Sequence, residues 1–197
     1  MKNAKALRAQ IATLSLAMTD FDPDSVQSVL RNFMAPDATV HLCHPFGDIV
    51  GPQALYDLAY APLLIAFPDL ERRDWIISTG TDADGADWIG CGGHYVGTFV
   101  SPFLDIPPTG HLAHMRFHEF YRVVDGKAVE MQAIWDFPEL MLQAGAWPMS
   151  PSLGREMFIP GPAAQDGLKP DGRNAEQSAH SLSVVMGMLT NLSLIHI

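Results

Sequence analysis

The fold is decided by residues 111–137, which read HLAHMRFHEFYRVVDGKAVEMQAIWDF. Apolar and polar residues alternate on both sides of Asp125-Gly126, as they do in strands whose side chains point to opposite faces of a sheet in turn. The Asp-Gly pair is typical of a tight turn between antiparallel strands. This stretch therefore predicts a long hairpin made of strands 111–124 and 127–137.

Two further strands precede this hairpin. Residues 74–79 and 87–99 show the same alternation. Turn residues separate the strands, with Asp84-Gly85 between the first two and the segment 107–110 before the third. Neighbouring strands joined by short turns pair antiparallel. The sequence thus predicts an antiparallel meander.

The N-terminal third of the chain has a different periodicity. Apolar residues recur at helical spacing in residues 4–18 and 24–33, and a third helix is predicted for residues 53–67. A short β-rich segment, 38–43, lies between the second and third helices. Helices followed by a sheet are typical of an α+β fold, in which the helices pack on one face of the sheet and bury both apolar sets.

The C-terminal part of the chain has the composition of a connecting segment. We expect residues 1–148 to fold as one α+β domain. Residues 149–178 are rich in Pro and Gly, which indicates a linker or a wrapping arm. Residues 179–197 begin with a helical pattern, which we interpret as the first helix of a truncated second domain. The final residues, LSLIHI, resemble a translated sequencing adapter; the alternative is a natural apolar tail that docks on the domain.

Composition and charge exclude several classes of protein. The chain has 22 Asp plus Glu against 12 Lys plus Arg, and a surface of net charge -10 repels nucleic acid and anionic membranes. Its longest apolar run, 59–67, is far shorter than the about 20 residues that cross a bilayer. The two cysteines lie far apart, and no export signal is recognisable. We expect a cytoplasmic protein with free thiols and a small-molecule partner.

Short motifs follow one another in the middle of the chain. In order they are AFPDL at 66–70, GT at 97–98, IPPTG at 106–110, RVVDGK at 122–127, Glu130 followed by Asp136, and LQAG at 142–145. Together they resemble the SnoaL-like polyketide cyclases, or ester cyclases, of the nuclear transport factor 2-like superfamily. The resemblance covers roughly residues 24–145. It implies a cone-shaped fold in which three N-terminal helices pack on a strongly curved antiparallel sheet around an apolar cavity.

Asp136 is the first candidate for catalysis. The resemblance implies that it is the acid/base aspartate of the family. Its neighbours Ile134, Trp135 and Phe137 are large and apolar, and partial burial among them raises the pKa of a carboxyl group toward the range useful for proton transfer. The alternative is structural, because an Asp before a proline, here Pro138, is a common helix N-cap.

Histidines gather on the strand 111–124. On a strand, His114, Arg116 and His118 share one face while His111 points to the other, and this arrangement does not favour a metal site. His114 and His118 are therefore candidates for a hydrogen bond to an enolate oxygen.

The hairpin turn decides whether Asp136 joins these histidines. A three-residue loop, 124–126, places Asp136 opposite His114. A two-residue loop places it opposite Met115 and turns the histidines to the other side. We favour the three-residue loop, the form that the family motif implies.

Further residues are predicted to contact the substrate, namely His41, Phe99, Arg116, Gln132 and Trp135. Phe99 stands where many members of the family have a histidine, and Gln132 where an aromatic residue often occurs. The sequence has no nucleotide-binding glycine motif and no nucleophile elbow. We therefore expect chemistry that uses neither a cofactor nor a metal.

The resemblance implies a cofactor-independent cyclase. Such an enzyme holds an enolisable polyketide-like or ester substrate in its cavity, where Asp136 moves a proton and a histidine binds the enolate. Two alternatives stay open: an epoxide-hydrolase-like hydrolase, and a non-catalytic module of the same fold that binds a small ligand or a partner. Members of the superfamily often pair through the outer sheet face, so we expect a homodimer.

Overall fold

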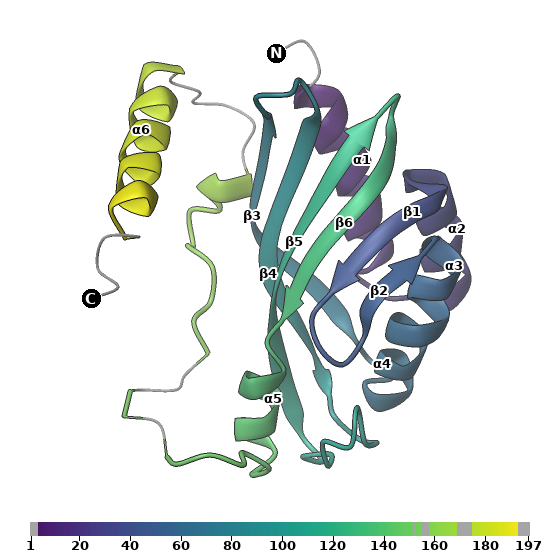
Figure 1. The fold of residues 1–197 in the computed structure, drawn as a ribbon. Helices are drawn as coiled ribbons and strands as arrows, with labels where there is room; N and C mark the ends of the chain where they lie inside the picture. The colour runs from purple at the N-terminus through teal and green to yellow at the C-terminus, as the bar shows by residue number, and fades with distance from the viewer. Residues whose placement is uncertain (1–3, 152, 155–157, 169–174, 193–197) are drawn as a thin grey trace.

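The computed structural model describes residues 4–151, 153–154, 158–168 and 175–192. Six strands form one sheet in the order β2-β1-β6-β5-β4-β3, and helices cover one of its faces (Figure 1). The strands are β1 (Met34–Leu42), β2 (Gly47–Val50), β3 (Glu71–Thr81), β4 (Asp87–Thr98), β5 (Leu112–Val124) and β6 (Lys127–Trp135). The α-helices are α1 (Ala4–Ala17), α2 (Pro23–Phe33), α3 (Pro52–Leu55), α4 (Ala61–Ala66), α5 (Phe137–Gln143) and α6 (Ala175–Leu192).

The sheet is curved and does not close into a barrel. Neighbouring strands pair antiparallel except β1 and β6, which run parallel with Val40 opposite Met131. The predicted α+β fold of N-terminal helices on a curved, mainly antiparallel sheet is thereby confirmed. The short strand β2 and the parallel pair were not predicted.

We call the face of the sheet that the helices cover the inner face, and the opposite one the outer face. Burial alternates along β5: Phe117, Glu119 and Tyr121 are buried on the inner face, whereas His118 and Phe120 are exposed on the outer face. The first two helices add to the core the apolar side chains of Leu7, Ile11, Leu14, Val26, Leu30 and Phe33.

The third predicted helix is present, but it is divided. A π-helical turn, Tyr56–Tyr60, separates α3 from α4. Pro62 follows this turn; because proline has no N–H and its ring collides with the preceding helical turn, a widened backbone accommodates it. The widened turn ends at Tyr60, whose side chain is completely buried.

The turn between β5 and β6 differs from the predicted one. Val124 pairs with Lys127, so the loop consists of two residues, Asp125 and Gly126, and the prediction of a three-residue loop is wrong. Both loop residues have positive φ, 49° and 76°. A turn of that kind matches the right-handed twist of the strands that it joins, which explains why Asp-Gly forms it.

A bulge in β6 then reverses which of its side chains point to the inner face and which to the outer face. Val129 is one residue extra on β6, and such a bulge turns every later side chain to the opposite face. As a result Gln132 shares the outer face with the histidines of β5, as the longer loop had predicted. The N–H of Asp136 donates to the carbonyl of Arg116 at 2.8 Å, so Asp136 is level with Arg116 and not with His114.

Two of the described segments after α5 bear on the domain division. Residues 158–168, which we call the arm, include a 3₁₀ turn, η2 (Asp166–Leu168), that contacts β3. The described side chains of α6 are exposed, and in Figure 1 this helix stands apart from the sheet. The division into segments 1–148, 149–178 and 179–197 stays a prediction, and residues 193–197 of LSLIHI lie outside the described part. Among the described helices, none is long and apolar enough to cross a membrane.

Candidate functional site

A carboxylate is buried in the middle of the inner face. Glu119 on β5 has no exposed surface. One of its oxygens accepts hydrogen bonds from Arg72 Nη1 at 2.6 Å and from Tyr121 Oη at 2.7 Å. The other accepts from Tyr95 Oη at 2.8 Å and from Trp135 Nε1 at 3.0 Å. These four donors lie on the four consecutive strands β3, β4, β5 and β6, so the sheet itself assembles the site.

Arg72 on β3 balances the charge of this carboxylate. Its guanidinium also pairs with Asp74, with Nη2 3.1 Å from Oδ1, and lies 4.1 Å from the centre of the Phe117 ring. Burial by itself lowers the pKa of Arg72, but the carboxylates of Glu119 and Asp74 outweigh burial and raise it well above its usual value. The guanidinium therefore stays charged.

Two phenols extend the network toward the helices. Tyr60 Oη lies 3.4 Å from Tyr95 Oη, and Tyr95 Oη in turn donates to Glu119. Burial raises the pKa of Tyr60 and of Tyr95, and the negative charge of Glu119 raises both further. Both phenols therefore remain protonated and act as hydrogen-bond donors.

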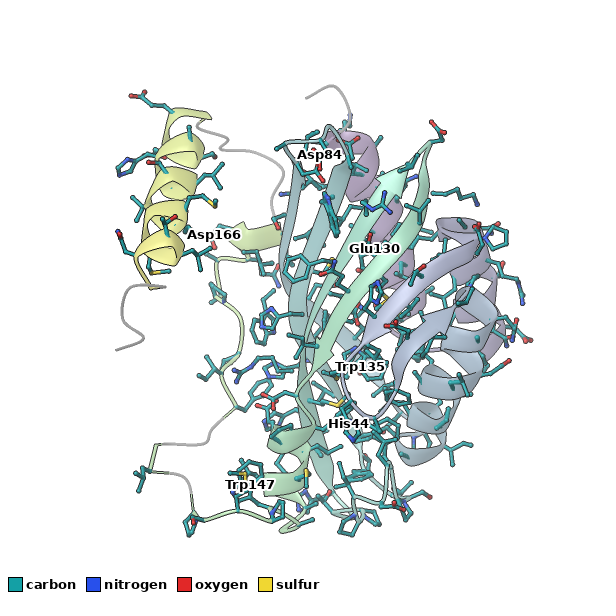
Figure 2. All side chains as sticks on the ribbon, in the orientation of Figure 1. His44, Asp84, Glu130, Trp135, Trp147 and Asp166 are labelled. Atoms are coloured by element: carbon teal, nitrogen blue, oxygen red, sulfur yellow. The ribbon has the colours of Figure 1, made fainter. Side chains whose placement is uncertain are left out.

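Aromatic side chains pack beside this network at one end of the sheet. The Phe46 ring centre lies 6.2 Å from that of Trp135 and 6.1 Å from that of Phe137, and Phe103 is 6.0 Å from Phe137. Figure 2 shows Trp135 near the point where β6 runs into α5. Phe99, also predicted to contact a substrate, is completely buried. Trp135 and Phe99 thus both belong to the core rather than to the outer face.

Three other predicted residues meet on the outer face. His41, His118 and Gln132 line an open groove of about 520 Å³, together with Leu42, Cys43, Phe120, Ala133 and Ile134. His41 Nδ1 is 2.7 Å from Asp48 Oδ1, and Gln132 Nε2 donates to Glu130 at 2.7 Å. Burial raises the pKa of the Cys43 thiol, which therefore is not an activated nucleophile.

Glycines in β4 shape this groove. A Cβ at Gly92 would lie 3.2 Å from His118 Nδ1, and one at Gly90 would lie 3.0 Å from Phe120 Cε1. The side chains of His118 and Phe120 therefore lean over these glycines. This leaves open space above β6.

Asp136 begins α5 as its N-cap. Its Oδ1 accepts the N–H of Glu139 at 3.0 Å. In the described residues, no hydrogen bond or ion pair joins Asp136 to His114 or His118. The structure thus places the aspartate in the capping position that the sequence offered as its structural alternative, and it does not gather the three predicted catalytic residues at one point.

Glu139 in the first turn of α5 holds the histidine-bearing strand. Its Oε2 accepts the N–H of Arg116 at 2.7 Å, and its Oε1 lies 3.4 Å from His114 Nε2 and 3.5 Å from Arg116 Nη2. Burial raises the pKa of Glu139, but the nearby His94 ring, the Arg116 N–H and His114 together bring it below its usual value. Burial lowers the pKa of His114, and the charge of Glu139 opposes this. A neutral imidazole next to a carboxylate is the expected state near neutral pH.

The sequence pattern did not lead us to predict the buried network around Glu119. Glu119 stands between Phe117 and Tyr121 at alternate positions of a strand, so a charged residue occupies a position that the pattern assigns to the core. Such a residue is rarely buried without a partner. That signal could have pointed to Glu119, although it could not have named Arg72 as its partner.

The arrangement offers hydrogen-bond donors, carboxylates and imidazoles. Within the described ranges, no group of three or more His, Cys, Asp or Glu side chains could hold a metal ion. Near Glu139, the guanidinium of Arg116 already supplies the positive charge. The inner network can therefore stabilise a negative oxygen, and the carboxylates can exchange protons.

A protein family and several solved structures resemble this chain. A family model described as SnoaL-like polyketide cyclase matches residues 12–144. Wild-type IdmH from Streptomyces antibioticus, a candidate polyketide cyclase, is 26% identical with a TM-score of 0.56, over 70% of this chain and 96% of its own. AclR from Streptomyces galilaeus, a candidate hydroxylase, is 22% identical with a TM-score of 0.57, over 75% and 91%. A candidate SnoaL-like polyketide cyclase from Jannaschia sp. CCS1 is 22% identical with a TM-score of 0.55, over 71% and 94%. None of the curated proteins matches. The resemblance read from the motifs is confirmed.

Proposed function

Since the chain belongs to the SnoaL-like polyketide cyclase family, we propose that it closes a ring in an enolisable, polyketide-like or ester carbonyl compound by acid/base chemistry without a cofactor. The observation that carries this proposal is the buried hydrogen-bonded chain on the inner face in which the phenols of Tyr60 and Tyr95 lead to the accepting carboxylate of Glu119. It holds protonated phenols among completely buried side chains, away from water. A developing enolate needs that kind of environment.

Tyr60 is the group that we assign to the enolate oxygen. It stands at the end of the chain, and its only hydrogen-bond contact among the described residues is the long one to Tyr95. Its O–H can therefore turn to a ligand at little cost. Behind it, Arg72 holds Tyr95 and Glu119 in place, so the groups next to the Tyr60 hydroxyl are already positioned before the substrate binds.

Asp136 is the group that we assign to proton transfer, the role that the family resemblance gives it. It follows Trp135 at the end of β6 and precedes α5. One carboxylate oxygen caps α5, and the other has no hydrogen-bond partner in the described residues. In an aldol ring closure Asp136 removes the α-proton, the enolate carbon attacks a second carbonyl, and the new alkoxide takes a proton back. His114 and His118 lie on the outer face, so Tyr60 takes the enolate role first expected of them.

The test is turnover of a panel of β-dicarbonyl esters. Asp136→Asn should lower kcat by roughly 10²- to 10⁴-fold, since it keeps the cap and removes proton transfer. Tyr60→Phe should lower it by roughly 10²-fold, as expected for the loss of one oriented donor. Tyr56→Phe, a buried phenol on the preceding turn, is the matched control and should be near wild type.

Two outcomes would overturn this assignment. If Asp136→Asn and Tyr60→Phe both keep wild-type turnover, the inner network is not the catalytic site. If His118→Gln lowers turnover while Tyr60→Phe does not, the chemistry belongs to the outer groove. Binding of the panel without any turnover would support the non-catalytic alternative.

We also propose that two copies pair through the outer face. Large apolar side chains are exposed there, with Ile76 at 51%, Phe120 at 47% and Ile134 at 65% of full exposure. A patch of this kind on one sheet is typical of an association surface. Light scattering at micromolar concentration should give the mass of a dimer, and Ile134→Asp should give a monomer. A monomeric wild-type protein would contradict the proposal.

A further inference from the structure

His94 on β4 is completely buried on the outer face, yet neither ring nitrogen has a hydrogen-bond partner. The nearest acidic atom is Glu139 Oε2, 3.7 Å from His94 Nε2, which is too far for a hydrogen bond. A buried polar group without a partner costs free energy. A neutral ring bears this cost far better than an imidazolium would.

Aromatic rings close the space around this histidine. The ring centres of Trp75 and Phe158 lie 4.4 Å and 4.7 Å from that of His94. Phe158 also lies 4.7 Å from His114, whose ring is 5.4 Å from His94. Trp75 belongs to the edge strand β3 and Phe158 to the arm. The arm thus covers two imidazoles with one aromatic side chain.

The rest of the arm fits closely against β3. A Cβ at Gly161 would lie 2.8 Å from Trp75 Cβ, and one at Gly167 would lie 2.5 Å from the backbone oxygen of Trp75. Arg8 of α1 contributes Nη1, which donates to the carbonyl of Leu168 at 3.4 Å. The arm is therefore docked along its described length, and glycines permit the close approach.

The two imidazoles share a single nearby carboxylate. Glu139 of α5 is the only carboxylate within ion-pair distance of them in the described residues. Arg116 of β5 already binds this carboxylate, and its Nε is buried without a partner. On β3, Arg73 is opposite His94 and is paired with Glu71. Imidazolium ions here would share one carboxylate with a guanidinium.

We propose that the arm is a proton-sensitive latch, in which neutral His94 and His114 hold Phe158 and acidification releases residues 158–168 from the sheet. A positive charge on the completely buried His94 ring needs water, and water reaches that ring only when the arm lifts, whereas the partly exposed His114 adds a second charge beside it. The arm carries no group of the proposed catalytic site, so the latch is independent of the proposed function. Release of the arm would expose His94 and Trp75 to solvent at mildly acidic pH.

Hydrogen exchange of peptides covering residues 158–168 tests the latch, because the N–H groups of Gln165 and Leu168 are hydrogen-bonded within the arm. After correction for intrinsic rates, exchange in the arm should be at least about tenfold faster near pH 5.5 than near pH 7.5, the range in which histidine titrates. Peptides from β5 should not change. Phe158→Ala should exchange fast at both pH values.

The double substitution His94→Gln/His114→Gln should keep the arm protected at both pH values, since glutamine does not titrate. His111→Gln changes an exposed histidine directly before β5; it is the matched control and should keep the pH dependence. Equal arm exchange at both pH values in the wild type would overturn the proposal, as would an unchanged pH dependence in the double variant. If the double variant does not fold, NMR titration of the wild-type histidine rings decides. The proposal is also overturned if neither the His94 ring nor the His114 ring changes its chemical shift at the pH midpoint of arm exchange.

Discussion

Replacing Glu119 with glutamine measures what the buried network contributes to stability. The substitution keeps the shape of the side chain but puts an NH₂ group where one carboxylate oxygen accepts two hydrogen bonds. Arg72 keeps Asp74 but loses its 2.6 Å ion pair with Glu119. Both members of that pair are completely buried, and removal of one partner from such a pair costs about 3–5 kcal/mol, here because the buried guanidinium loses the closer of its two carboxylates.

A loss of that size is easily measured. At about 2–4 °C per kcal/mol for a chain of this length, Tm should fall by roughly 6–20 °C. Urea unfolding gives the free energy directly, and tryptophan fluorescence is a suitable probe because Trp135 belongs to the network.

Glu130→Gln is the matched control; Glu130 lies on β6, and Figure 2 shows it well apart from Trp135. Glu130 Oε2 is 2.8 Å from Arg122 Nε, but this pair is partly exposed. Solvent screens it, so its loss should cost less than about 1 kcal/mol. If Glu119→Gln and Glu130→Gln lose the same free energy of unfolding, the reasoning about the buried pair is refuted.

Three further substitutions and conditions test other parts of the structure. Gly93→Ala should strongly lower Tm, because its Cβ would lie 2.2 Å from the backbone oxygen of Arg73; a wild-type Tm would contradict this packing. Asp136→Ala should lose about 1 kcal/mol through the α5 cap, whereas Asp136→Asn should lose almost nothing in urea unfolding, and equal losses would argue against the cap. Burial lowers the pKa of His114, so the unfolded chain binds this proton more readily and the free energy of unfolding should fall as the pH drops below about 6.5. His114→Gln should flatten that slope in urea midpoints measured against pH, and an unchanged slope would exclude His114 as its source.

The strands of the meander were predictable because they obey a simple pattern. Period-two alternation and the Asp-Gly turn were enough to place β5 and β6, and helical spacing placed α1 and α2. The parallel pairing of β1 with β6 was not predictable, because it joins segments far apart in the chain. The bulge at Val129 also left no local signal, since a valine fits any position of a strand.

The candidate site was predictable only in part. Alternation correctly put His114, Arg116 and His118 on one face, but it could not say which face the helices would cover. The motif around Asp136 predicted both a catalytic and a capping role, and the structure supplies the cap. The ring of donors around Glu119 depends on contacts between several strands, and no single strand carries the pattern that would predict it.

The arm also has a consequence for aggregation. β3 is an edge strand, paired on one side only, and it carries Trp75, Ile76 and Ile77 in sequence. A long apolar edge is a ready template to which a strand of another molecule can add. Here the backbone of the arm lies against Trp75 and Ile76, and a register shift between Asp74 and Ile76 interrupts the regular edge. A strand of another molecule that adds to β3 at Trp75 and Ile76 would therefore first have to displace residues 158–168.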